Sequence, residues 1–456
     1  MRLPEKADIM PWMARTISSP ATRRCRQAIH RLRATRKGEG NVVDVFINPR
    51  DPFSFVLLQA LPELAYRYDV QLRFFTVWHQ PREMFPEPAM WTDWAITDAA
   101  RLARLYGLTP PESPDLPTEN ALSHCRDQLL ALESSDSYLA RATEAMRAVW
   151  QGEITPDDDI TATSNTELTE RLRANEQRLV DLGHYQGSMV HFRGEWFWGV
   201  DRLDHLERLL IREGRAHQPD QTPAWDRTWA TLGQDAQPLE SPDQALLEVF
   251  FSIRSPYSYL GLERAVLLAR AWNIPLRLRP VLPMLMRGQS VPDAKKWYIF
   301  QDTKREATKL GIPYGFVADP LGPGVERCYA LFEYARSCRR EIDYMRAYAR
   351  AVNAEGIRSE TDSGLRTIVE RAGLDWSKAR ALLEDQGWRE WAEENRKAMY
   401  DLGLWGVPSF RYGDTGCWGQ DRLWLIEDEI KKRVETGSTQ AVETTDDAER
   451  HTDPAQ

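Results

Sequence analysis

The sequence predicts an α/β protein in which one structural unit occurs twice along the chain. Blocks of sequence recur in the same order, and both halves show the same succession of predicted strands and helices. Val45–Phe55 aligns with Val249–Tyr259, and Trp198–Leu203 aligns with Trp418–Leu423. Because separate blocks recur in one order, they indicate an internal duplication.

Each unit is expected to begin with a strand, a helix and a strand, and to end with two short strands and a helix. A long helical insertion separates these two parts. The predicted strands are Val42–Ile47, Gln71–Val77, Met189–Phe192 and Trp196–Trp198, then Leu246–Ser252, Pro275–Pro280, Ser409–Tyr412 and Gly416–Trp418. The predicted helices include Pro52–Tyr66 in the first unit, and Pro256–Trp272, Asp293–Leu310 and Gly324–Ala354 in the second.

Composition changes along the chain predict five segments. Residues 1–40 form a basic extension, residues 41–212 the first unit, and residues 245–434 the second unit. Residues 213–244, rich in Pro, Gln and Asp, are expected to link the two units. Residues 435–456 are polar with almost no large apolar side chains, which is typical of a disordered tail.

The charge of the chain is unevenly distributed. The whole sequence has a net charge of −9, whereas Met1–Gly40 contains ten Lys or Arg residues against three acidic ones. Such an arm can bind nucleic acid or an anionic membrane, or it can form a helix across an acidic body. We expect the helix across the body. Because the acidic body has no basic stripe flanked by aromatic residues, no nucleic-acid partner is expected.

Other sequence-wide features predict a cytoplasmic protein without a membrane span. No run of 18 apolar residues occurs, and the start lacks the apolar core of a secretory signal. The cysteines form no Cys-x-x-Cys motif and no metal-ligand spacing, so we expect free thiols and no metal site. They are Cys25, Cys125, Cys328, Cys338 and Cys417.

Four short motifs in the second unit resemble one protein family. They are Ser255–Leu260 (SPYSYL), the helically spaced Lys295, Tyr298, Asp302 and Arg305, Gly406–Phe410 (GVPSF) and Trp418–Leu423 (WGQDRL). The unit resembles the DsbA-like thioredoxin family, especially its glutathione-dependent branch of 2-hydroxychromene-2-carboxylate isomerases and kappa-class glutathione transferases. The resemblance implies an α/β fold of two thioredoxin-like, DsbA-type units, each with a helical insertion between its β-α-β and β-β-α halves. The first unit resembles the family less well.

Ser255 opens the segment where a disulfide oxidoreductase of this family carries Cys-x-x-Cys. Disulfide exchange requires a protein thiolate, so that activity is excluded at this position. The resemblance implies that glutathione is the cofactor, and that Ser255 is the catalytic residue that hydrogen-bonds its thiolate. The helix N-terminus also favours negative charge. A serine before a proline is equally a common helix N-cap, and both roles are compatible.

The resemblance assigns five further residues to glutathione binding. Val407 and Pro408 match a cis-proline turn, where the backbone before the proline pairs with the cysteinyl backbone as an added strand would. Gln420 and Asp421 match positions that hold the γ-glutamyl end, and Lys295 matches a lysine that neutralises a carboxylate. By local sequence alone, Pro408 is also a strand-entry proline, Asp421 a helix N-terminal charge and Lys295 a surface lysine.

The first unit lacks most of these groups. It has Asp51, Trp91 and Ser188 at the positions of the serine, the lysine and the proline. A carboxylate at the serine position would raise the pKa of a thiol, and a cis bond before serine is very rare. We therefore expect a structural unit, packed on the second as an intramolecular pseudo-dimer because proteins of this branch tend to form homodimers. Further homo-oligomer formation is left open.

The sequence thus predicts a glutathione-dependent isomerase, similar to 2-hydroxychromene-2-carboxylate isomerase, that acts on a small hydrophobic aromatic electrophile. A kappa-like glutathione transferase and a non-catalytic thioredoxin-fold binding or scaffold protein are the alternatives. Several tryptophans are candidates for the substrate pocket, although core packing is the commoner role of such residues. They are Trp272, Trp297, Trp388, Trp391 and Trp405.

Overall fold

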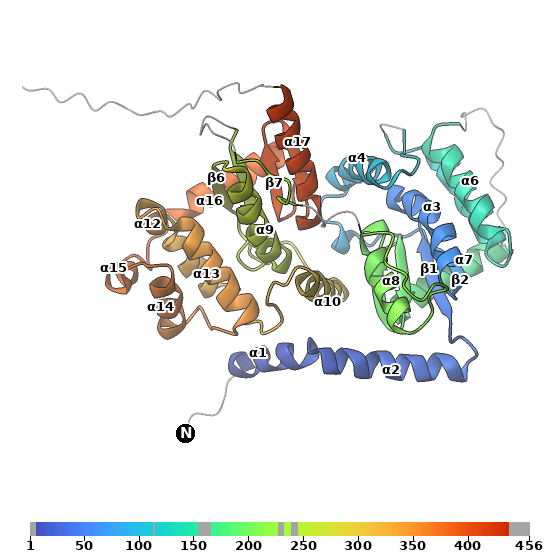
Figure 1. Ribbon diagram of the computed structural model, residues 1–456, viewed down its shortest axis with the longest axis horizontal. Helices are drawn as coiled ribbons and strands as arrows, with labels where there is room; N and C mark the ends of the chain where they lie inside the picture. The colour runs from blue at the N-terminus through green and yellow to red at the C-terminus, as the bar shows by residue number, and fades with distance from the viewer. Residues whose placement is uncertain (1–5, 113–114, 154–165, 227–231, 239–244, 437–456) are drawn as a thin grey trace, which may run out of the picture.

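The computed structural model describes residues 6–112, 115–153, 166–226, 232–238 and 245–436. It contains two four-stranded sheets with the same strand order, β2-β1-β3-β4 and β6-β5-β7-β8. In both sheets the first two strands are parallel and the remaining pairs are antiparallel. This mixed α/β architecture is consistent with two thioredoxin-like units (Figure 1).

The strands differ from the predicted ones by at most one residue at either end. They are β1 (Val42–Ile47), β2 (Gln71–Thr76), β3 (Met189–Phe192), β4 (Glu195–Trp198), β5 (Leu247–Phe251), β6 (Leu276–Pro280), β7 (Ser409–Tyr412) and β8 (Thr415–Trp418). Short 3-10 helices are η1 (Arg82–Met84), η2 (Val200–Arg202), η3 (Met284–Arg287) and η4 (Gln420–Arg422).

The α-helices form the layers around these sheets. The first unit has α3 (Pro52–Arg67), α4 (Pro88–Tyr106), α5 (Glu119–Leu132), α6 (Tyr138–Trp150), α7 (Thr166–Asp181) and α8 (Leu203–Arg212). The second has α9 (Pro256–Trp272), α10 (Asp293–Lys309), α11 (Pro323–Ala330), α12 (Phe332–Ser337), α13 (Glu341–Ala354), α14 (Asp362–Arg371), α15 (Trp376–Ala381), α16 (Trp388–Asp401) and α17 (Leu423–Thr436). Among these described helices, none combines the length and hydropathy that a bilayer span requires.

The central strand of each sheet and the helix that follows it position the candidate site. Strands β1 and β5 are buried along nearly their whole length, as expected for strands covered on both faces. Helices α3 and α9 each begin with a proline, which loses no hydrogen bond in the first turn. The helical insertions, α4–α7 and α10–α16, occupy the predicted place between the β-α-β and β-β-α parts.

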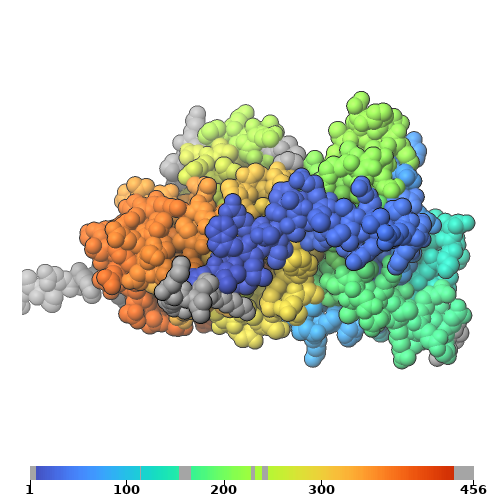
Figure 2. Space-filling view, turned by 90° about the horizontal axis from the view of Figure 1, so that it is seen from below, coloured from blue at the N-terminus to red at the C-terminus, as the bar shows by residue number. Residues whose placement is uncertain are grey.

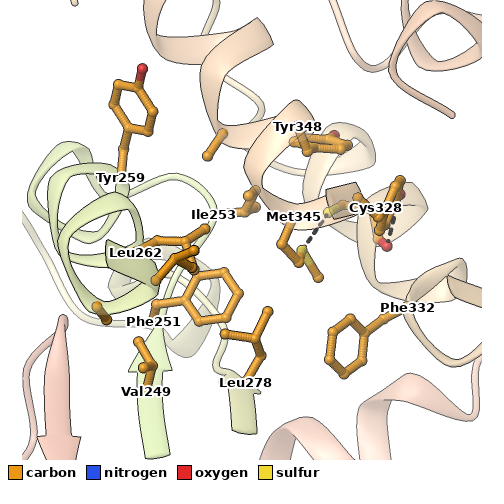
Figure 3. Packing of buried hydrophobic residues seen from close by; sticks show 14 of the residues in the cluster. Val249, Phe251, Ile253, Tyr259, Leu262, Leu278, Cys328, Phe332, Met345 and Tyr348 are labelled. Atoms are coloured by element: carbon orange, nitrogen blue, oxygen red, sulfur yellow. Dashed lines mark hydrogen bonds between the residues drawn. The ribbon is translucent and has the colours of Figure 1, made fainter. Parts of the chain in front are cut away.

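The core of the second unit joins its sheet to its helical insertion. Phe251 and Leu278 of β5 and β6, and Leu262 of α9, share one cluster with Phe332 and Met345 of the insertion (Figure 3). All five side chains are buried. Burial of such a side chain contributes about 1.5–3 kcal/mol. This packing fixes α9 relative to the sheet.

Helices α1 (Lys6–Ile17) and α2 (Pro20–Arg36) form a strap, defined as residues 6–36, that crosses both units (Figures 1 and 2). The basic extension therefore lies across the body of the protein, as expected. Ser18, between the two helices, donates a hydrogen bond to the carbonyl oxygen of Gly315 in the second unit at 3.2 Å.

The strap is fixed to the first unit through Glu195. This carboxylate accepts two 2.6 Å hydrogen bonds from Arg23 and one of 2.7 Å from Gln27. Burial alone raises the pKa of Glu195, but the charges of Arg23 and Arg305 outweigh burial and lower the pKa to about 2. Because Arg305 belongs to α10, Glu195 joins the strap to both units.

The segment between the units is anchored to each of them. Trp225 is buried in the core of the first unit, and the N–H of Gly233 donates to Glu427 of the second unit at 2.8 Å. The predicted linker therefore runs along both units where it is described. Parts of the predicted linker and tail lie outside the described residues, namely 227–231, 239–244 and 437–456.

A buried ionic network joins the two units, and Arg202 of the first unit forms one half of it. Its Nε lies 2.9 and 3.0 Å from the two carboxylate oxygens of Asp302, and its Nη1 donates to Asp421 at 2.8 Å. Burial alone lowers the pKa of Arg202, but the acidic partners raise it well above the ordinary value. Both acidic partners belong to the second unit.

Arg422 of the second unit forms the other half of this network. It donates to Asp98 at 2.9 Å and to Asp201 at 2.7 and 3.0 Å. Arg422, Asp98 and Asp201 occupy the same positions in the repeat as Arg202, Asp302 and Asp421, with the two units exchanged. The network is therefore reciprocal.

A second reciprocal contact lies beside the ionic network. Arg101 of the first unit donates to the carbonyl oxygen of Gly416 at 3.2 Å, and Arg305 of the second donates to that of Trp196 at 2.6 Å. Reciprocal contacts between equivalent residues define an isologous interface, the type found in two-fold symmetric dimers. The two units therefore pack as a pseudo-dimer within one chain.

Replacing Arg422 with methionine is expected to lower the free energy of unfolding by about 3–5 kcal/mol, because two buried carboxylates lose their counter-charge. Chemical denaturation followed by circular dichroism measures the change. The control is Arg380→Met, because the Arg380 side chain is 67% exposed and lies 3.6 Å from Asp362. The control should alter stability by less than about 0.5 kcal/mol. Equal losses in both variants would contradict the importance of the network.

Candidate active site

A cavity of about 280 Å³ lies where the second unit meets the first, beside the N-terminus of α9. Its walls come from α9, α10, the turn before β7 and η4, together with segments of the first unit. The walls include all six residues that the sequence predicted for the site. These are Ser255, Lys295, Val407, Pro408, Gln420 and Asp421.

Ser255 is half-buried at the N-terminus of α9. Its Oγ accepts a hydrogen bond from the backbone N–H of Ser258 at 3.3 Å, so Ser255 caps the helix. A hydroxyl oxygen that accepts in this way keeps its own hydrogen for a ligand. The helix N-terminus adds a partial positive charge. The cap therefore also suits an anionic atom in the cavity.

The peptide bond between Val407 and Pro408 is cis, as the resemblance implied. Pro408 packs closely on α9 at Gly261, where a Cβ atom would lie 2.9 Å from the proline Cγ, so this approach requires glycine. The backbone N–H and C=O of Val407 make no hydrogen bond with any described residue. Such unpaired backbone beside a cavity can pair with a peptide ligand as an added strand does.

Lys295 brings a positive charge to the cavity without a carboxylate beside it. Its Nζ donates to the carbonyl oxygen of Met84 in the first unit at 2.5 Å, and no described acidic side chain pairs with it. Burial lowers the pKa of Lys295 to about 8. Because an anion would stabilise the charged amine, this position favours the carboxylate of a ligand.

Gln420 and Asp421 line the cavity and also have partners within the protein. The Gln420 side chain accepts from Arg264 at 2.7 Å and donates to Glu306 at 2.8 Å, so its amide joins α9 to α10. Asp421 accepts from Arg202 at 2.8 Å. Its carboxylate therefore joins the cavity to the interface network.

Tyr257 also connects the cavity to the interface, a role that the sequence did not reveal. Its hydroxyl donates to Asp302 at 2.7 Å, and the same carboxylate binds Arg202. Burial raises the pKa of Tyr257 well above its ordinary value. The tyrosine therefore stays neutral and holds the loop that carries Ser255 against the network.

The first unit supplies an aromatic wall of the cavity, which sequence analysis missed. This wall consists of the aromatic residues Phe85, Trp91, Trp94, Tyr185 and Trp198, together with Met84. Trp94 meets Trp418 of the second unit edge to face, with ring centroids 4.7 Å apart. Trp91, Trp94 and Trp198 occupy the repeat positions of Lys295, Tyr298 and Trp418. Combining the repeat with an isologous interface could have identified them.

Of the five tryptophans that the sequence proposed for the pocket, Trp405 lines the cavity. Trp272 and Trp388 are buried in the core of the second unit, and Trp391 packs against that core. Trp297 is 47% exposed and lies beside Arg26 of the strap. The general preference of tryptophan for core packing thus applies to most of these residues.

The equivalent position in the first unit is closed by its own side chains. Ser188, in a turn without a cis bond, donates to Asp51 at 2.8 Å, and Asp51 caps α3 by accepting from the Phe53 N–H at 3.0 Å. Burial raises the pKa of Asp51 to about 6. A Cβ atom on Gly187 would lie 2.5 Å from the Asn48 side chain. These contacts engage the residues that stand at the repeat positions of Ser255, Val407 and Pro408.

Comparison with known proteins relates this site to one family. Residues 246–431 match the model of the DSBA-like thioredoxin domain. The 2-hydroxychromene-2-carboxylate isomerase of Pseudomonas putida is 27% identical over 190 residues, covering 40% of this chain and 92% of that protein. Glutathione S-transferase kappa 1 of Homo sapiens is 28% identical over 205 residues, covering 40% of this chain and 88% of that protein.

A solved structure of a 2-hydroxychromene-2-carboxylate isomerase aligns with 25% identity and a TM-score of 0.38, covering 42% of this chain and 97% of that one. The match to the family model includes the second sheet, its helical insertion and all six predicted site residues. Residues 246–431 of this chain therefore form a DsbA-like thioredoxin domain that is homologous to 2-hydroxychromene-2-carboxylate isomerases and to kappa-class glutathione transferase.

Proposed function

We propose that the second unit binds glutathione and isomerises a hydrophobic aromatic electrophile, in the manner of a 2-hydroxychromene-2-carboxylate isomerase. The observation that carries this proposal is the convergence of Ser255, the cis Val407–Pro408 turn and Lys295 on one cavity with an aromatic wall. Homology to isomerases and to a glutathione transferase supports the same class of chemistry.

The cavity offers a suitable group for each part of glutathione. Ser255 suits the sulfur, the free backbone of Val407 suits the cysteinyl peptide, and Lys295 suits a carboxylate. When bound, glutathione would supply the nucleophilic thiolate that the Ser255–Ser258 segment lacks. The Ser255 hydroxyl would donate to this sulfur and, with the N-terminus of α9, keep it ionised near neutral pH.

The tryptophans of both units around the cavity indicate the substrate class. Trp91, Trp94, Trp405 and Trp418 present flat apolar surfaces around the cavity, which favour an aromatic ring over a polar chain. The first unit therefore contributes to substrate binding although its own site is closed.

Transfer of glutathione to similar electrophiles is the second candidate, supported by the 28% identity with glutathione S-transferase kappa 1. Product analysis separates the two reactions. An isomerase returns free glutathione with a rearranged substrate, whereas a transferase releases a conjugate. A scaffold protein would bind no glutathione at all.

Isothermal calorimetry with glutathione should detect saturable binding that falls roughly 10- to 100-fold in Lys295→Ala, because a charge-assisted hydrogen bond is lost. Lys304→Ala is the matched control. Lys304 lies on the same helix and also donates to a backbone carbonyl oxygen, that of Tyr314, but it lies outside the cavity. Equal losses in both variants, or no binding by the unmodified protein, would refute the assignment of this cavity.

Ser255→Ala should raise the pKa of the bound glutathione thiol by about one to two units, because it weakens binding of the thiolate form while leaving the affinity for the protonated thiol nearly unchanged. The reason is that a hydrogen bond to the charged sulfur is worth about 1.5–3 kcal/mol, at about 1.36 kcal/mol per pKa unit. Ultraviolet absorbance of the thiolate during a pH titration measures the shift. Ser258→Ala is the control, because its hydroxyl is buried and accepts from the N–H of Ser252 at 3.2 Å. If the titration midpoint does not move in Ser255→Ala, this serine is a helix cap alone.

The affinity for S-methylglutathione, whose sulfur cannot ionise, should fall as pH rises through about 8. Lys295 has a pKa of about 8 in the folded protein, so its charge is present below that pH and lost above it. The carboxylate of the bound ligand stabilises the protonated amine of Lys295 and therefore shifts the loss of affinity to somewhat higher pH. Lys295→Arg keeps its charge in this range and should remove this part of the pH dependence. Identical pH profiles for the two proteins would argue against a carboxylate at Lys295.

A further inference from the structure

The strap exposes an unusual share of large apolar side chains. Thirteen such residues are exposed among the described residues, and six lie in the strap. They are Ile9, Met10, Trp12, Met13, Ile29 and Leu32, with exposed fractions of 45–58%. Exposed apolar residues gathered in one segment indicate a surface that interacts with another body.

The apolar residues of α2 form a row that faces away from the protein. The side chains of Ala21, Cys25, Ala28 and Leu32 are exposed and follow one another at spacings of three or four residues, so they share one helix face. The opposite face holds the strap to the first unit through Arg23. Figure 2 looks onto the side of the molecule that the strap crosses.

Arginines border this row on both sides. With about 100° of rotation per residue, Arg24 and Arg31 lie along one margin of the row, and Arg33 and Arg36 along the other. All four are exposed, and none forms an ion pair with a described residue. The outer face of α2 is therefore a narrow apolar strip between two lines of positive charge.

We infer that the outer face of the strap docks on a phospholipid surface that carries negative charge. A helix with this pattern lies in the plane of a bilayer interface, with its apolar side chains inserted and its arginines extended to the head groups. Ile9 and Met13 are further exposed apolar side chains of the strap, on α1. Met1–Gly40 contains ten basic and three acidic residues, and this excess of positive charge complements the negative charge of the lipid head groups.

Other partners match this face less well. Nucleic acid is bound mainly through phosphate contacts, which do not require an exposed apolar row. A second strap packed on the same face would bring its arginines against those of the first. Anionic lipid satisfies both features at once, because its head groups pair with the arginines and its acyl chains receive the apolar row.

Co-sedimentation of the full chain with lipid vesicles tests this. Binding to vesicles with about one third phosphatidylserine should be at least about tenfold tighter than to phosphatidylcholine alone, and should weaken as salt screens the charges. The triple variant Arg24→Gln, Arg31→Gln, Arg36→Gln should bind the anionic vesicles about tenfold more weakly, or weaker still. The double variant Ile29→Gln, Leu32→Gln should weaken binding by a similar factor.

Controls carry Arg→Gln or Leu→Gln substitutions at exposed positions outside the strap. One control is the double variant Arg366→Gln, Arg380→Gln, whose side chains are 59% and 67% exposed. The other is Leu267→Gln, at a side chain that is 61% exposed. Both variants should bind vesicles as the unmodified protein does. Absence of vesicle binding, or equal loss in strap and control variants, would overturn the inference. If the protein binds duplex DNA but not vesicles, the face belongs to a nucleic-acid partner and the inference is wrong. If the protein binds no vesicles but forms a dimer that Leu32→Gln abolishes, the face belongs to a second copy of the chain and the inference is again wrong.

Discussion

Two buried guanidinium groups, Arg202 and Arg422, hold this chain in its arrangement. A buried charge is costly unless opposite charges and hydrogen bonds compensate it, and each of these arginines finds two carboxylates in the opposite unit. Neither unit alone can therefore satisfy its own central arginine. The cavity depends on the same groups, because Asp302 holds Tyr257 and Asp421 lines the cavity wall.

The two units keep one architecture but have different sites. In the second, the cis turn at Pro408 and the open backbone of Val407 leave room for a ligand. In the first, Asp51 and Ser188 bind each other in the equivalent place. Because the fold rests on the core and the ionic network, the first site could change without loss of structure. Its unit still provides counter-charges for the interface and an aromatic wall for the cavity.

The fold followed from the sequence to a large extent. Apolar runs predicted all strands, and the proline at the start of α9 predicted where that helix begins, because these are local preferences of the backbone. The repeat also indicated that both sheets share one topology. Helix boundaries within the insertion were less predictable, since short helices such as α12 and α15 are selected by packing on their neighbours.

The sequence by itself determined that the Ser255 segment has no thiol for disulfide exchange, that a proline stands at position 408, and which unit keeps the motif. Tertiary structure alone decided the partners of Gln420 and Asp421, the isolation of the Lys295 charge, and the tryptophans that face the cavity. Local motifs encode backbone conformation through neighbouring residues. Burial and charge pairing instead depend on side chains that lie more than a hundred positions apart in the chain, and only the packed interface brings these together.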